Sequence, residues 1–422
     1  MRTGLGACIG RKPHAAVLLA LSLAAFAAVC AVHGLPMADV HVYRAEGEAV
    51  SRGTDLYGFT VTAWKLPATY PPFAALLFAP LAWLSFGAAK AAFLAGNLVL
   101  LVLLVHLSLR FTAVPGGREV RLPLLLTATA AGLWLEPVFQ TVLFGQINLL
   151  LACVVLWDLG RPDGARGKGI AVGVAAGVKL TPAVFAVYLL LTGRVRAALA
   201  SLAGFAGTAA LGALVLPDAS REFWTRRIFE TTRVGKAWIV DNQSLQGLAA
   251  RVAHTAEPGM LWLVPAAVLA AAGLALACLL RRRHGLEGWG VLVTALTALL
   301  VSPISWSHHW VWCVPLLVLI AAEPAGRGAA VAVYAVFSAR TLWLVPKHGT
   351  LDLRLPWWAQ PLASPYPLLT AVLLAGVAAR CYSASGPAPP PDGSGAPGAS
   401  GEPASAAGSG APVSRSCEST MR

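Results

Sequence analysis

The stretch KAAFLAGNLVLLVLLVHLSL, residues 90–109, decides the fold class, because almost every residue after Lys90 is apolar. At about 1.5 Å of rise per residue, a helix of this length is about 30 Å long and crosses the hydrocarbon core of a bilayer. Residues 15–32 form a similar run. A membrane β-barrel would instead alternate apolar and polar residues. The sequence therefore predicts an all-α protein with several membrane-spanning helices.

Composition supports the same fold class and argues against nucleic acid as a partner. Of the 422 residues, 57% are hydrophobic and 12% are charged, far from the usage of a soluble domain. The net charge is +13, but the arginines and lysines cluster in short loops between apolar runs, where they set membrane orientation. We therefore expect membrane lipids, and no nucleic acid, as partners.

Motifs for metals and cofactors are absent from the sequence. The seven cysteines are scattered without regular spacing, so neither a disulfide framework nor a zinc site is expected. No Walker loop or dinucleotide fingerprint occurs, and we expect no cofactor. The basic residues Arg2, Arg11 and Lys12 precede a long apolar run, which we interpret as an uncleaved signal anchor.

The apolar runs predict about twelve transmembrane helices. The stretch ATYPPFAALLFAPLAWLSF, residues 68–86, contains three prolines and is interpreted as a re-entrant or interfacial segment. The predicted helices occupy residues 14–35, 86–109, 122–143, 146–159, 169–179, 181–192, 197–216, 260–280, 286–302, 306–322, 327–345 and 365–380.

Charge in the short loops predicts the orientation in the plasma membrane. With residues 1–13 in the cytoplasm, four short basic loops all fall on the cytoplasmic side, as the positive-inside rule requires. The longer loops, residues 36–67 and 217–259, then lie outside. Residues 14–382 form one membrane domain, and the Gly-, Pro- and Ser-rich residues 383–422 are predicted to be a disordered cytoplasmic tail. The basic loops carry Arg110, Arg118 and Arg121; Arg161, Arg166 and Lys168; Arg194 and Arg196; and Arg281, Arg282 and Arg283.

Polar motifs collect at the outer ends of the predicted helices. Chance would scatter them over both faces, so their position on one face predicts a shared cavity that opens away from the cytoplasm. The motifs are ADVHVYR (38–44), FGQINLL (144–150), GVKLTP (177–182), DNQSLQGLAAR (241–251) and SPISWSHHW (302–310).

Asp39 follows the first predicted membrane helix. An isolated aspartate is often a solvated loop residue or a helix N-cap. Its place at the membrane surface, with Tyr43 and Arg44 about one helical turn further on, makes a catalytic carboxylate the competing interpretation. We therefore predict Asp39 as a catalytic residue and the other two as substrate-binding residues.

Lys179 interrupts an apolar run, where an ammonium costs about 3 kcal/mol unless it is paired or lines a wet cavity. Thr181 and Pro182 follow as a plausible N-cap and first helical residue. Free N–H groups and an ammonium together form an anion site. The alternative is a lysine that snorkels to the interface.

Two amide pairs, Gln146 with Asn148 and Asn242 with Gln243, offer donors and acceptors that suit a hydroxyl-rich ligand. They could equally bond neighbouring helices or cap a helix that runs to Arg251. All five residues are predicted to bind substrate.

His308 and His309 are adjacent, so on a helix they point about 100° apart and cannot chelate one metal as residues i and i+4 would. One interpretation makes them helix-end residues beside the interfacial Trp306, Trp310 and Trp312. The other has them donate hydrogen bonds or positive charge to a phosphate. No metal site is predicted.

In their shared order, the motifs resemble glycosyltransferase family 87. This resemblance runs from about residue 36 to residue 312. The matching segments are DVHVYR (39–44), LY (56–57), YPPF (70–73), GQIN (145–148), KLTP (179–182), NQSL (242–245) and SPISWSHHW (302–310).

The resemblance implies a GT-C membrane enzyme that forms an α-(1,2) linkage on the extracytoplasmic face. Its donor would be polyprenyl-phosphate mannose, and its acceptor a mannosylated lipid or glycan. The family's essential aspartate would fall on Asp39 and its histidine element on His308 and His309. A glycosyl phosphate already carries a good leaving group, so a carboxylate base and a cationic phosphate site suffice, and a single displacement inverts configuration.

Two alternatives remain open from the sequence. A transporter or flippase of lipid-linked sugars would also use broken helices and polar residues within the membrane. A GT-C enzyme could instead use another polyprenyl-phosphate sugar. The sequence identifies neither the acceptor nor which of the two histidines matters more.

Overall fold

A computed structural model describes residues 12–114, 117–347 and 349–384 of the chain. These residues form a helical bundle, with one short antiparallel hairpin made by β1 (Thr60–Val61) and β2 (Leu66–Pro67). The all-α prediction is confirmed. Most of the predicted N-terminal segment and nearly all of the predicted tail, residues 383–422, lie outside the described residues.

Five helices within the described ranges are long and apolar enough to cross a membrane. A sixth span exists if α5 (Arg118–Gly132) and α6 (Glu136–Phe144), which meet at a 72° bend, count as one. The five are α1 (Lys12–His33), α4 (Phe86–Leu109), α10 (Val195–Val215), α14 (Met260–His284) and α19 (Pro365–Ala384).

The other predicted spans are helical but short. A helix of eight residues, such as α9 (Val184–Leu191), is only about 12 Å long and cannot cross a bilayer alone. The prediction of about twelve full spans is therefore not confirmed, although each predicted stretch contains helix. The remaining short helices are α7 (Asn148–Leu159), α8 (Ile170–Val178), α15 (Glu287–Val301), α16 (Cys313–Ala322) and α17 (Arg327–Ser338).

The segments expected as outer loops contain helices of their own. Within residues 36–67 lies α2 (Ala38–Arg52), whose mixed polar and apolar sequence hid it from a search for apolar runs. Residues 68–86 do not form one continuous helix, as expected, because α3 (Pro72–Phe78) is followed by a 3₁₀ turn. Further short elements are α11 (Pro217–Thr225), α12 (Thr231–Val234), α13 (Leu245–Val252), α18 (Gln360–Ala363) and the 3₁₀ turns Ala79–Trp83, Thr181–Ala183, Arg227–Phe229, Ser307–Trp312, Thr341–Trp343, Leu351–Arg354 and Trp357–Ala359.

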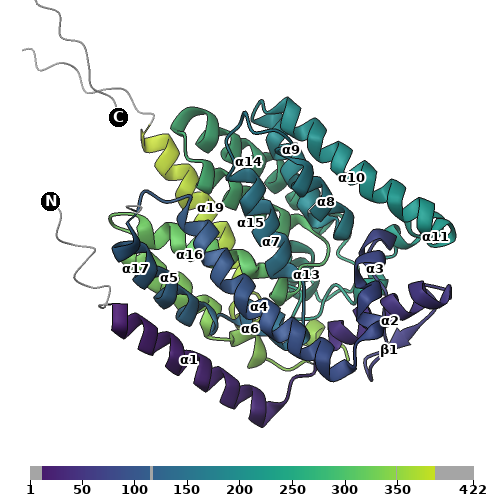
Figure 1. Cartoon of the computed structure of the whole chain (residues 1–422). Helices are drawn as coiled ribbons and strands as arrows, with labels where there is room; N and C mark the ends of the chain where they lie inside the picture. The colour runs from purple at the N-terminus through teal and green to yellow at the C-terminus, as the bar shows by residue number, and fades with distance from the viewer. Residues whose placement is uncertain (1–11, 115–116, 348, 385–422) are drawn as a thin grey trace, which may run out of the picture.

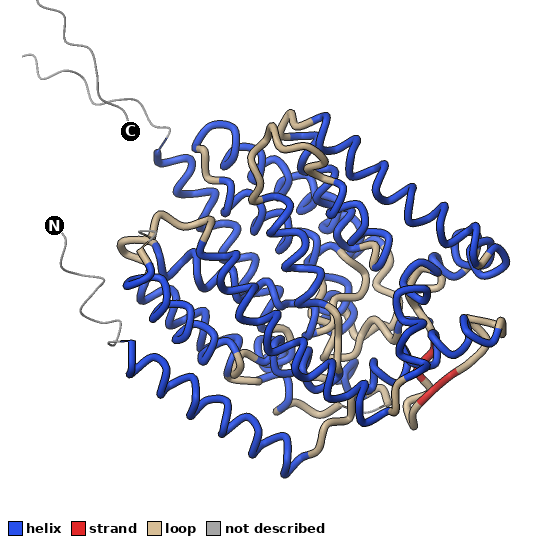
Figure 2. The backbone as a smooth tube through the Cα atoms, in the orientation of Figure 1, coloured by secondary structure: helices blue, strands red, loops and turns tan. Residues whose placement is uncertain are grey.

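The bundle has two distinct ends (Figure 1). Helices α2, α3 and α11 and the hairpin gather at one end, whereas α1 begins and α19 finishes at the other. Helix α1 runs along the outside of the bundle, where Ser22 donates a hydrogen bond to the Ala130 carbonyl of α5 at 2.9 Å. Figure 2 shows loops passing between the helices inside the bundle. The break between α6 and α7, residues 145–147, is buried, whereas the loop between α7 and α8 is largely exposed.

Three of the predicted basic loops meet. Asp163 forms ion pairs with Lys168 at 2.8 Å, with Arg281 at 2.9 Å and with Arg194 at 3.7 Å. These residues come from segments far apart in the sequence. Their convergence places these three basic loops together at one face of the described bundle.

Helix α8 packs closely on α10 through a stripe of glycines. A Cβ atom added at Gly173 would lie 1.9 Å from the Ser201 carbonyl oxygen, and one added at Gly177 would lie 1.9 Å from the Thr208 hydroxyl. Small residues allow helix backbones to approach in this way inside a membrane. The contact fixes the end of α8, and with it the following residue, Lys179.

The start of α2 is fixed against the end of α6. Helix α6 ends in a Schellman motif, in which Gly145 adopts a φ of 71° and the Gln146 N–H bonds the Thr141 carbonyl at 2.9 Å. The Met37 N–H donates to the Leu143 carbonyl at 2.9 Å. A Cβ at Gly145 would lie 2.3 Å from a methyl group of Val40 in α2. Glycine therefore satisfies both the turn and the close approach.

We expect Gly145→Ala to destabilise the protein more than Gly53→Ala. Both glycines end a helix with a positive φ, of 71° and 64°, so both substitutions carry a left-handed backbone cost of about 1–2 kcal/mol. Only Gly145 also meets a neighbouring side chain, since nothing lies within 4 Å of a Cβ at Gly53. Thermal unfolding in detergent compares the two variants; equal shifts in Tm would contradict the packing of α2 on α6.

Candidate active site

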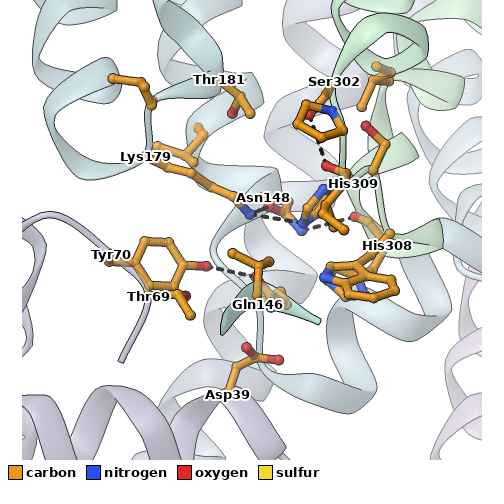
Figure 3. Close-up of a pocket in the computed structure, with 18 of the residues that line it drawn as sticks. Asp39, Thr69, Tyr70, Gln146, Asn148, Lys179, Thr181, Ser302, His308 and His309 are labelled. Atoms are coloured by element: carbon orange, nitrogen blue, oxygen red, sulfur yellow. Dashed lines mark hydrogen bonds between the residues drawn. The ribbon is translucent and has the colours of Figure 1, made fainter. Parts of the chain in front are cut away.

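A cavity of about 1070 Å³ opens between α2, the breaks in the bundle and the segment that follows α10. Polar groups and the rings of Tyr70, Trp306 and Trp312 contribute to its wall. Seven of the predicted site residues line it: Asp39, Gln146, Asn148, Lys179, Thr181, His308 and His309 (Figure 3). The sequence motifs therefore do meet at one cavity.

Asp39 lies in the first turn of α2 and is hydrogen-bonded to the Gln146 side chain. The amide oxygen of Gln146 accepts hydrogen bonds from the hydroxyls of Tyr43 and Tyr70, each at 3.2 Å. The two hydroxyls are themselves 3.0 Å apart. Because both tyrosines point their O–H groups at the amide oxygen, the amide NH₂ is left to face the carboxylate. Gln146 therefore orients Asp39.

The environment of Asp39 makes it a competent base near neutral pH. Burial raises the pKa of the Asp39 carboxyl to about 6, while the hydrogen bond from Gln146 and the charge of Lys179 act in the opposite direction. A general base works best when its pKa lies near the working pH. Asp39 therefore stays ionised at pH 7 and still accepts a proton readily.

Lys179 forms the second polar group of the cavity. Its ammonium donates to the Asn148 side-chain oxygen at 3.0 Å and lies 3.1 Å from Nε2 of His309. It also sits 5.5 Å from the centre of the Tyr70 ring. Nε2 of His309 can accept from the ammonium only if the ring carries its proton on Nδ1 and is neutral. Lys179 then carries the positive charge of the cluster that it forms with Asn148, His309 and Tyr70. None of these contacts is with a carboxylate, so the charge is not neutralised by them.

His308 is held by its backbone. Its carbonyl accepts hydrogen bonds from Thr141 and from Asn148, each at 3.0 Å. The ring packs edge-on against Phe144, 5.6 Å between centres, and its Nε2 is buried without a hydrogen-bond partner. A buried, unpartnered imidazole nitrogen beside a cavity is available to a ligand atom.

Thr181 lines the cavity but does not cap a helix. The 3₁₀ turn Thr181–Ala183 has Leu180 at its N-cap position, and no side chain caps it. The prediction of Thr181 as an N-cap was wrong, because Leu180 already has helical backbone angles and Thr181 itself lies within the turn. Thr181 nevertheless places a hydroxyl in the same cavity as Lys179.

The other five predicted substrate-binding residues lie outside the cavity lining. Asn242, Gln243 and Arg251 are fully buried outside its lining, and their side chains bond backbone. Arg251, for example, donates to the carbonyls of Ile239 and Asn242 at 2.9 and 3.2 Å. Tyr43 donates a hydrogen bond to Gln146, and Arg44 pairs with Glu48 at 3.2 Å. Tyr43 and Asn242 support the cavity wall from outside it, by hydrogen bonds to Gln146 and to the Ser305 N–H.

Two buried polar residues, one in the cavity lining and one outside it, were not predicted from the sequence. Tyr70 was quoted within the YPPF segment but given no role, and it contacts both Gln146 and Lys179. Glu136 is buried and accepts from the Tyr366 hydroxyl at 2.6 Å and from the Trp343 indole at 3.3 Å. A buried acid in an apolar run, like Glu136, was a signal available in the sequence.

Among the described residues, no group of three or more His, Cys, Asp or Glu side chains could hold a metal ion. The predicted site residues that line the cavity supply one carboxylate, one ammonium, two imidazoles, two amides and one hydroxyl.

Comparison with known proteins decides the family. The model of glycosyltransferase family 87 matches residues 68–303, more than half of the chain. The chain belongs to glycosyltransferase family 87. The family resemblance of the sequence motifs is thereby confirmed, and the protein is a membrane glycosyltransferase rather than a transporter.

Relatives of the glycosyltransferase include two curated enzymes from Mycobacterium tuberculosis. One, a polyprenol-phosphate-mannose-dependent alpha-(1-2)-phosphatidylinositol mannoside mannosyltransferase, is 36% identical over 67% of this chain and 69% of its own. The other, named for phosphatidylinositol pentamannoside, is 37% identical over 75% and 74%. A phosphatidylinositol mannoside mannosyltransferase of Mycolicibacterium smegmatis is 34% identical over 76% and 81%. No solved structure matches the chain significantly.

The glycosyltransferase should lose activity in acid as Asp39 is protonated. With a pKa of about 6, the ionised fraction, and hence turnover, falls about tenfold between pH 7 and pH 5. Gln146→Ala removes a hydrogen bond that lowers this pKa, so the acid limb should move to higher pH. Gln140→Ala, at another glutamine of the cavity wall, should leave the limb in place. A pH–rate profile that is flat down to pH 5 would contradict Asp39 as the titrating group.

Proposed function

We propose that the enzyme transfers mannose from polyprenyl-phosphate mannose to a phosphatidylinositol mannoside and forms an α-(1,2) linkage with inversion. The observation that carries this proposal is the pairing of one oriented carboxylate, Asp39, with one ammonium, Lys179, across a single cavity. The names of the relatives supply the sugar, the donor lipid, the acceptor and the linkage.

In the proposed reaction, Asp39 takes the proton of an acceptor hydroxyl as its oxygen attacks the anomeric carbon. The new carbon–oxygen bond forms while the bond from the anomeric carbon to the phosphate oxygen breaks, and the phosphate leaves with the electron pair. Lys179 and a proton on Nε2 of His308 stabilise the departing charge, where electrostatic stabilisation contributes most. A single in-line displacement converts a β-linked donor to an α-linked product.

His309 has a positioning role in this scheme. It accepts from the Lys179 ammonium at 3.1 Å and thereby aims it, together with Asn148 at 3.0 Å. Gln146 orients the base in the same way. The two charged groups are thus each held by neutral side chains, which leaves their charges for the substrates.

We place the cavity on the extracytoplasmic side of the plasma membrane. The convergence of Arg194, Arg281 and Lys168 on Asp163 marks a basic face, which the positive-inside rule assigns to the cytoplasm. The first and last described helices begin and finish at one end of the bundle, and α2 lies at the other (Figure 1). Residues 14–382 would then form the catalytic domain, with residues 383–422 as a cytoplasmic tail.

Asp39→Asn should reduce mannose transfer about a hundredfold or more, because the amide keeps the shape of the carboxylate but cannot accept the proton. Transfer from synthetic polyprenyl-phosphate mannose to phosphatidylinositol mannoside is measured in membranes at matched expression. Asp55→Asn is the control, since Asp55 lies outside the cavity lining and bonds the Tyr57 N–H at 2.9 Å. Undiminished transfer by the Asp39 variant would reject the role of base.

Lys179→Ala should raise the KM for the donor about tenfold or more and leave the KM for the acceptor nearly unchanged, because a charge-assisted contact to phosphate is lost. Lys347→Ala provides the comparison, because Lys347 lines the same cavity but is already paired with Asp241 at 2.9 Å. Equal rises in both KM values for the Lys179 variant would argue against its contact with the donor phosphate.

A further inference from the structure

Residues of the segment 217–234 contribute to the cavity wall. The segment begins directly after α10 ends at Val215, one of the helices long enough to span a membrane. The side chain of Phe229 is 75% exposed, whereas Ile228 and Arg233 line the cavity. An apolar group facing outward beside a polar cavity is the arrangement expected where a lipid enters from the bilayer.

Four Lys and Arg side chains line the cavity, and two of them are neutralised by carboxylates. Arg227 pairs with Glu222 at 2.6 Å and with Glu230 at 2.7 Å, and Lys347 pairs with Asp241. The remaining two are Lys179 and Arg233, which have no carboxylate oxygen of the described residues within 4.0 Å. The donor has one phosphate, and Lys179 accounts for it.

Arg233 keeps hydrogen-bonding capacity as well as charge. Its guanidinium donates to the backbone carbonyls of Tyr57 and Ala68 and lies 5.8 Å from the centre of the Tyr57 ring. These contacts hold the group in place but use only part of its N–H groups. A fixed guanidinium with free donors is suited to a phosphate oxygen.

Arg233 and Lys179 line the cavity at different places, and contacts of Tyr70 connect the two. The Lys179 ammonium contacts the ring of Tyr70, whereas the Tyr57 ring beneath Arg233 donates its hydroxyl to the Tyr70 carbonyl at 2.9 Å. The two unpaired cations thus belong to separate parts of one wall. One anionic group at each is compatible with two lipid substrates bound together.

We propose that Arg233 binds the phosphodiester of the acceptor, so that the acceptor class is an anionic phospholipid whose headgroup lies on residues 217–234. This inference rests on the proposed function and deepens it. A phosphodiester lies at the surface of the bilayer, which is the level at which α10 ends. The sugars of the acceptor then extend from Arg233 toward Asp39, and its acyl chains remain beside Phe229.

The test compares two acceptors and three variants. The acceptors are phosphatidylinositol mannoside and octyl mannoside, which carries the sugar without a phosphate. Arg233→Gln should raise the KM for the first about tenfold, with the KM for the second and for the donor unchanged. Arg233→Lys keeps the charge and should recover most of the affinity. Arg226→Gln is the control, because Arg226 is exposed, lies outside the cavity lining and pairs with Glu230 at 2.8 Å.

Each other outcome overturns the inference. An equal rise in KM for both acceptors would show that Arg233 only links Tyr57 and Ala68 structurally. A KM that stays high in Arg233→Lys would lead to the same conclusion. A raised donor KM would assign Arg233 to the donor phosphate. An unchanged KM for phosphatidylinositol mannoside would leave Arg233 without this role. If the wild-type enzyme transfers no mannose to either acceptor, the proposed function itself fails.

Discussion

The candidate site depends on the hydrogen bonds that fix the Gln146 amide. Tyr43 comes from α2, Tyr70 from the segment before α3, and Gln146 from the break between α6 and α7. All three are buried, so an unpaired hydroxyl or amide among them would be costly. That cost locks three distant segments into one arrangement. The orientation of the Asp39 carboxylate follows from it, because the amide can present only its NH₂ group.

Broken helices explain how a polar cavity exists inside an apolar bundle. Helix α6 ends at Phe144 and α8 ends at Val178, and the site residues Gln146 and Lys179 follow directly after these ends. Backbone that leaves a helix within a membrane is tolerated where it lines a cavity or is covered by protein. The loss of helix length and the presence of the site are therefore two results of the same breaks. Glycine contacts between α8 and α10 hold these interrupted helices in the bundle.

The sequence predicted the class of fold and much of the site, because both depend on where polar residues interrupt apolar runs. Lys179 and the histidines stood out for that reason, and Asp39 stood out because it directly follows the first apolar run. The sequence did not predict α2, because this helix is short and mixes polar and apolar residues, so it does not stand out as an apolar run. Nor could it separate Asn148, which faces the cavity, from Asn242, which bonds the carbonyls of Ala237 and Pro303. That distinction depends on contacts between residues distant in the chain.

The glycine-packed contact of α8 with α10 has a consequence for the catalytic cycle. Backbone packed on backbone has no long side chains to rearrange, so the wall that carries Lys179 is rigid. Another part of the cavity wall includes Arg227, which is held by ion pairs between partly exposed side chains, and such pairs can exchange with water. In the proposed reaction, a wider cavity for product release would come from movement of residues 217–234, where the acceptor is proposed to bind. The proposed donor site at Lys179 would keep its shape between turnovers.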